Sequence, residues 1–183
     1  MITVQRLAVP SALPVTVAEA MNHARVDYQG EAAAIEGMIT AATAELERLA
    51  EIAVLPQTIR VIFEGLASDG WQRLPIGPVI GEPLFELTAD GLPVDGELLG
   101  GIRPQFRPLA PASELRHARV FLDYQAGWAS PPADVRQAIP DQVAVSYSYR
   151  AATAHNSHRA STGLGAMAYA MQRAIGRYRG VSL

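Results

Sequence analysis

The 183-residue chain contains no cysteine and no lysine, and it has no acidic residue after position 149. Without cysteine there are no disulfides and no thiolate metal sites, and nothing points to an oxidising compartment. No apolar run reaches the roughly 18 residues that a membrane-spanning helix needs, so we expect no membrane partner. The first residues lack the pattern of a signal peptide, and we expect none. Arginine in place of lysine indicates a GC-rich genome rather than a function.

The charges are divided unevenly along the chain. All 18 acidic residues precede position 150, and so do all but five of the arginines. The five that follow are Arg150, Arg159, Arg173, Arg177 and Arg179. The body therefore carries about −8 and the C-terminal segment about +5. An acidic body with a basic, small-residue-rich segment is typical of a protein that docks onto a large partner.

Helical signals dominate the first 56 residues. Thr16 and Glu19 have the spacing of a capping box, which predicts a short helix from Val17 to about Val26. The apolar residues of 31–53 recur at helical spacing, which predicts a longer helix there. Pro56 prevents that helix from continuing.

Residues 57–129 have the alternation and turn signals of a mostly antiparallel β unit. We expect about five strands, and the Asp90-Gly91 and Asp95-Gly96 pairs are hairpin signals. The expected strands cover 59–64, 71–74, 84–89, 102–107 and 118–126.

Residues 130–183 return to helical patterns. A helix is expected from about Asp134 to Ala152, although Pro140 should kink or restart it. Alternation at 143–149 fits a strand as well, so helix and strand both remain open there. A loop over 151–165 and a final helix over 166–178 complete the chain. The predicted fold class is α+β, in which segments 1–56 and 130–183 form one helical domain with the β unit inserted.

No constellation of side chains indicates an enzyme. His155 and His158 have the spacing of a metal pair, but no third ligand is near them, so a polar loop is favoured. Ser157 and Ser161 lack the motif of a nucleophile. Gly163-Leu164-Gly165 lacks the strand and the lysine of a phosphate loop. We therefore predict no catalytic residues, no metal and no cofactor.

The basic segment offers two kinds of contact. Arg173 and Arg177 are four residues apart and share a helix face. They suit either DNA phosphates or the acidic groups of a protein partner. Because the whole protein is acidic, protein docking is favoured, and a DNA-binding accessory protein remains the alternative.

Several short segments of the chain form an ordered set of motifs. The N-terminal ones carry LPVTVAEA, HARVD and ITAATAE, and the later ones carry LPQT, LDYQAGW, PPADVRQAI and IGRYR. In sequence order they are 13–20, 23–27, 39–45, 55–58, 122–128, 131–139 and 175–179. This set resembles the head–tail connector (adaptor) proteins of tailed phages and phage-derived gene transfer agents. Each motif is short, and the resemblance rests on their shared order along nearly the whole chain.

The resemblance implies a structural role without catalysis. Such proteins form a ring, typically of about twelve subunits, with closed symmetry. The ring binds the portal protein on one side and a stopper or tail-completion protein on the other, and DNA passes through its lumen. The expected location is the neck of a virion or virion-like particle assembled in the bacterial cytoplasm. The C-terminal segment would be the arm that binds the portal, through Arg159, Arg173, Arg177, Tyr178 and Arg179.

Overall fold

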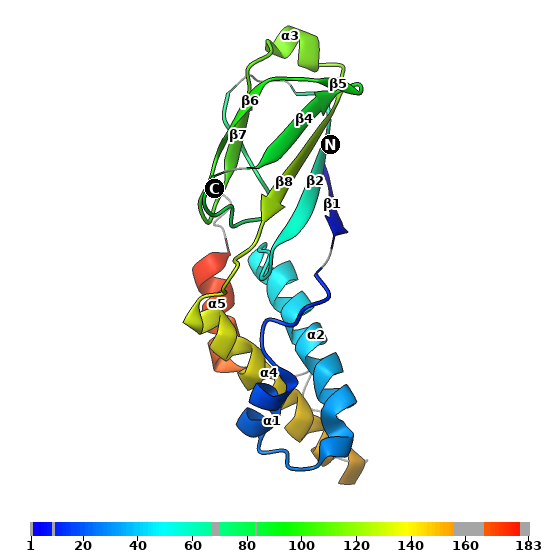
Figure 1. Cartoon of the computed structure of the whole chain (residues 1–183), viewed down its shortest axis with the longest axis vertical. Coiled ribbons are helices and arrows are strands. Elements are labelled where there is room, and N and C mark those ends of the chain that lie inside the picture. Colours follow the sequence, from blue (N-terminus) through cyan, green and yellow to red (C-terminus); the bar gives the residue numbers. More distant parts are fainter. Residues whose placement is uncertain (1, 9, 67–69, 83, 156–166, 180–183) are drawn as a thin grey trace. The chain divides into compact units, whose positions relative to one another are not determined.

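A computed structural model describes residues 2–8, 10–66, 70–82, 84–155 and 167–179 (Figure 1). It confirms the α+β fold class, with helices and antiparallel sheets in one chain. The chain divides into two compact units. The β unit comprises residues 1–11 and 51–130, and the helical unit comprises residues 12–50 and 131–183.

Four α-helices make up the described part of the helical unit: α1 (Val17–Ala24), α2 (Ala32–Ala50), α4 (Ala133–His155) and α5 (Tyr169–Tyr178). A short 3-10 helix, Gln29–Glu31, precedes α2. Helices α2 and α4 each contact the other three helices of this unit. Ile35, Ile39 and Leu46 of α2 are fully buried. No helix in the described ranges is long and apolar enough to span a membrane.

The capping box predicted at the start of α1 is present. The Glu19 amide donates to Thr16 Oγ1 at 3.1 Å, and the Thr16 amide donates to Glu19 Oε2 at 2.7 Å. The hydrogen bond from the Thr16 amide is the main cause that holds the pKa of Glu19 below its ordinary value. Each bond satisfies an amide that the first helical turn leaves unpaired.

Residues 141–150 are helical, so the strand alternative is wrong. Helix α4 continues through Pro140 without interruption. Val135, Ile139 and Val143 recur at spacings of four residues, Ala138 lies three residues after Val135, and all four are fully buried. Packing of this face decides between helix and strand, because the alternation at 143–149 buries only its first member, Val143.

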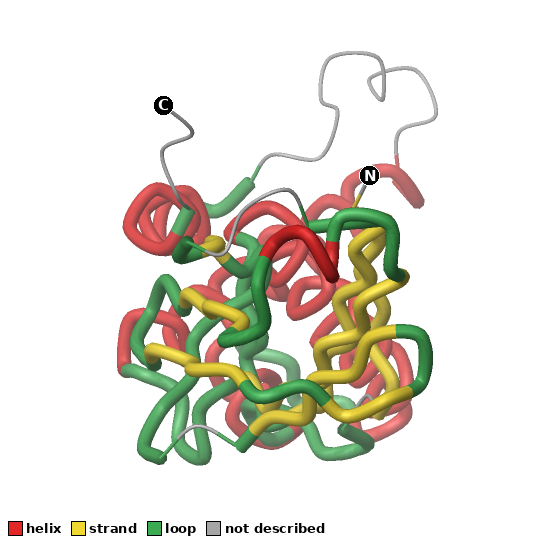
Figure 2. Tube along the Cα trace, turned by 90° about the horizontal axis from the view of Figure 1, so that it is seen from above, coloured by secondary structure: helices red, strands yellow, loops and turns green. Residues whose placement is uncertain are grey.

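The β unit contains two antiparallel sheets. The five-stranded sheet has the order β1 (Ile2–Ala8), β2 (Gln57–Glu64), β8 (Arg119–Ala126), β4 (Phe85–Ala89) and β5 (Leu92–Pro93). The three-stranded sheet has the order β3 (Gln72–Arg73), β7 (Gln105–Pro108) and β6 (Gly96–Leu99). The short helix α3 (Ala112–Leu115) lies at one end of this unit (Figure 1). Figure 2 shows the helices and strands of the chain from above.

The core of the β unit lies between the two sheets. Alternate residues of β2 and β8 face it, and Phe63 meets Phe106 of β7 with ring centroids 5.1 Å apart. Tyr124 of β8 is buried here, and its hydroxyl donates to the Ile76 carbonyl at 2.7 Å. Burial raises the pKa of this hydroxyl far above its ordinary value.

The structure differs from the sequence expectation at the N-terminus. The sequence predicts a helical segment over 1–56, but Ile2–Ala8 form strand β1, which pairs with β2 in the β unit. The strands β5 and β6 and the helix α3 were also not predicted. The strands pair with partners in other elements, and α3 has only four residues, so local pattern alone identifies them poorly.

Candidate docking surfaces

Helix α5 is amphipathic, and this places the expected docking residues. Met171, Ala174 and Tyr178 are buried at spacings of three and four residues. Arg173 and Arg177 lie outside this buried face and are exposed. The side chain of Arg177 is 70% exposed.

A groove lies between α4 and α5. It is lined by Asp134 and Gln137 of α4 and by Ala170, Arg173, Ala174 and Arg177 of α5. Tyr178 contacts a residue of this lining, since its hydroxyl lies 3.0 and 3.1 Å from the two carboxylate oxygens of Asp134. Arg177 donates to the same carboxylate at 3.1 Å. Asp134 thus binds both Arg177 and Tyr178, in the last turn of α5.

The environment of Tyr178 fits a structural contact. The residue is 4% exposed. Burial, and then the hydrogen bond with Asp134, raise the pKa of its hydroxyl above the ordinary value of 10.0. The hydroxyl is therefore protonated at neutral pH and donates to the Asp134 carboxylate.

Arg173 has a different environment from Arg177. Its guanidinium lies 5.8 Å from the centre of the Tyr169 ring, and Tyr169 is 74% exposed. Among the described residues no carboxylate is paired with Arg173. A guanidinium held over an aromatic ring at the rim of a groove is suited to bind a carboxylate in a fork-shaped geometry.

The remaining basic residues are placed less uniformly. Arg179 is exposed directly after α5, and Arg159 lies outside the described residues. Arg150, within α4, is paired with Glu31. Part of the positive charge of the C-terminal segment is thus neutralised by carboxylates of the helical unit, at Arg150 and at Arg177.

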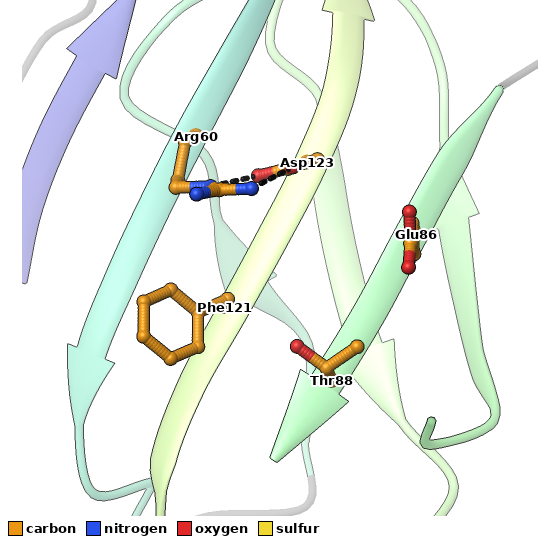
Figure 3. A pocket seen from close by; sticks show the side chains of 5 residues that line it. All are labelled: Arg60, Glu86, Thr88, Phe121 and Asp123. Carbon is orange, nitrogen blue, oxygen red and sulfur yellow. Dashed lines mark hydrogen bonds and ion pairs between the residues drawn. The ribbon is translucent and has the colours of Figure 1, made fainter. Parts of the chain in front are cut away.

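A second surface is a hollow on the outer face of the five-stranded sheet (Figure 3), which the sequence did not indicate. Arg60 of β2 donates to both oxygens of Asp123 of β8, at 2.7 and 2.6 Å, and it lies 5.7 Å from the Phe121 ring centre. Hydrogen bonding to Asp123 is the main cause that raises the pKa of Arg60. Glu86 and Thr88 of β4 complete the lining.

Strand register produces this hollow. Arg60 is directly opposite Asp123, and Glu86 is opposite the same aspartate on its other side. The alternation of β2 and β8 predicts that these side chains face away from the core, but the pairing of the two strands cannot be read from either strand alone. Arg60 and Asp123 already bind each other, so the hollow is lined by a solvated ion pair between neighbouring strands.

The described residues show no metal-binding cluster, since no three His, Cys, Asp or Glu side chains among them are close enough to hold an ion. His155 ends α4, whereas His158, its expected partner in a metal pair, lies outside the described residues. His23 of α1 is paired with Asp141 of α4 at 2.6 Å.

Comparison with known proteins gives structural matches alone. No protein-family model and no curated protein matches the chain. A chain in the structure "Virion of native gene transfer agent (GTA) particle" is 25% identical, with a TM-score of 0.69. A chain in "Neck of empty GTA particle computed with C6 symmetry" is 24% identical, with a TM-score of 0.71.

A chain in "Neck of native GTA particle computed with C12 symmetry" is 26% identical, with a TM-score of 0.66. Each match covers 99% of the present chain and 97% of the other chain. The present chain therefore shares its fold, along nearly its whole length, with chains of these particles.

Proposed function

We propose that this protein is a structural, non-enzymatic component of the neck of a gene transfer agent or phage-like particle. Within the neck it is the head–tail connector, a ring below the portal protein that joins the DNA-filled head to the stopper or tail. The observation that carries the proposal is the full-length fold match to chains of gene transfer agent virions and necks. The ordered motifs of the sequence support the connector role within that neck.

Ring formation follows from this role. Two of the matched neck structures were computed with C6 and with C12 symmetry. In a cyclic ring each copy presents two different surfaces, one to each neighbour, and rotation closes the assembly. About a dozen copies of this chain form the proposed ring.

The α4–α5 groove is the proposed portal contact. Arg173 brings a guanidinium without a carboxylate partner in the described structure, and Arg177 brings one that is 70% exposed beside Asp134. Carboxylates on the portal protein match both groups. Arg159 and Arg179 are further arginines of the C-terminal segment that are proposed to bind the portal protein. Tyr178 is proposed to take part through its bond to Asp134.

Charge reversal tests this contact. Replacing both Arg173 and Arg177 with Glu should abolish attachment to the portal protein, because two attractive pairs become repulsive. The helical unit should stay folded, since both side chains are exposed. Attachment is measured by co-sedimentation of the purified protein with portal rings, and folding by circular dichroism.

Arg48→Glu is the matched control, since Arg48 is exposed on α2 and does not line the groove. The control variant should attach normally. If the double variant attached as strongly as the natural protein, the groove would not be the portal contact.

A further inference from the structure

Strand β1 is the longest sheet edge in the described part of the protein. It spans seven residues, Ile2–Ala8, and pairs on one side with β2 (Figure 1). The other edge strands are shorter: β5 and β3 have two residues each, and β6 has four. β5 also contains Pro93, which cannot donate to a further strand. An edge as long as β1 offers a row of backbone donors and acceptors to another strand.

The core-facing side of β1 is apolar but not covered. Ile2 is opposite Phe63 of β2, and Val4 is opposite Val61, so each pair shares one face of the sheet. Phe63 is 3% exposed and Val61 is 0% exposed, whereas Ile2 is 58% exposed and Val4 is 37% exposed. The apolar row that forms the core therefore continues onto β1 and is open to solvent there.

β1 carries few of the devices that normally protect an edge. Ile2–Ala8 contain no proline, no lysine and no acidic residue. Arg6, the one charged residue of the strand, donates to Gln57 Oε1 at 2.7 Å and to the Ile52 carbonyl at 3.1 Å, both within the same unit. The irregularity in pairing lies between Arg6 and Ala8, so Ile2–Arg6 form a regular edge.

We propose that β1 is a contact between neighbouring copies of this chain, in which the β unit of a second copy adds backbone hydrogen bonds to the edge and covers Ile2 and Val4. This inference rests on the proposed ring. The C6 and C12 symmetry of the matched necks favours a second copy as the occupant. Because a cyclic contact joins two different surfaces, β1 meets a segment of the neighbour other than its own β1.

Val4→Lys tests the contact. A lysine at this position puts a charge where the neighbour must cover the strand, which should weaken self-association at least about tenfold. The monomer should tolerate it, because Val4 is already 37% exposed. Leu84→Lys is the matched control: it adds the same charge at an exposed apolar residue of the β unit that lies outside β1. Oligomer mass is measured by mass photometry over a concentration series, alone and on portal rings.

The expected result is that the natural protein and Leu84→Lys form the ring, while Val4→Lys remains smaller at the same concentration. In the assembled ring, hydrogen exchange of the β1 amides should also slow relative to the monomer. If Val4→Lys formed rings like the natural protein, or β1 exchange did not change, the β1 contact would be wrong and the ring would stand.

Two other outcomes separate this contact from the ring. Open oligomers that depend on Val4 but never close would support the β1 contact and contradict the ring. A natural protein that stayed monomeric, both alone and on portal rings, would overturn both.

Discussion

At the scale of single residues, Asp134 organises the candidate docking groove. Its carboxylate binds the Tyr178 hydroxyl and the Arg177 guanidinium, and so joins the first turn of α4 to the last turn of α5. The sequence predicted the shared face of Arg173 and Arg177, because that face depends on a spacing of four residues. It did not predict Asp134 as the partner of Arg177, since that contact joins residues 43 positions apart.

Removing the Tyr178 hydroxyl should destabilise the helical unit. Tyr178→Phe keeps the buried ring but loses the hydrogen bond to a charged group, and we expect a loss of about 1 kcal/mol in the free energy of unfolding. Tyr169→Phe, in the same helix at an exposed position, should change it by less than about 0.5 kcal/mol. Urea unfolding followed by the helical circular dichroism signal measures both. Equal stabilities of the two variants would show that the Tyr178–Asp134 bond contributes nothing.

At the scale of elements, the sequence predicted the helices and strands whose residue pattern lies within the element itself. Helices α1 and α2 follow from a capping box and an apolar face, and β2 and β8 follow from alternation. Strand β1 was missed although Ile2 and Val4 alternate with polar residues, because a few residues at an edge carry little signal until their partner is known. In α4 the sequence left helix and strand open, and the burial of Val135, Ile139 and Val143 decided for helix.

Two glycines should respond oppositely to alanine. At Gly127, which follows β8, φ is +116°, and an added Cβ would lie 2.2 Å from the Leu55 carbonyl oxygen. Gly127→Ala should therefore destabilise the β unit by about 2 kcal/mol or more. Gly37 lies within α2 with nothing near its Cβ position, so Gly37→Ala should stabilise the helical unit by about 0.5–1 kcal/mol.

Thermal unfolding measured by calorimetry tests the pair. A Gly127→Ala protein as stable as the natural one would contradict the close approach of Leu55 to the strand end. A Gly37→Ala protein that lost stability would contradict an open site on α2.

At the scale of the whole molecule, the uneven charge of the sequence has a structural counterpart. The acid-free C-terminal segment supplies α5, whose arginines line a groove, and part of its charge is already paired with carboxylates. This distribution favours a protein partner over DNA, because nucleic-acid affinity depends on the number of free cations that reach phosphates. The charge pattern of the sequence indicated docking onto a partner. The ring and its two partners are inferred from the resemblance to connector proteins, and they are proposed.

The most direct test of the connector role is the mass of the purified protein, alone and mixed with its portal protein. The connector role predicts a co-assembled ring of about a dozen copies on the portal protein. A monomer that ignores the portal protein but binds DNA, with an affinity that falls steeply as salt rises, would contradict it and identify a DNA-binding accessory protein instead.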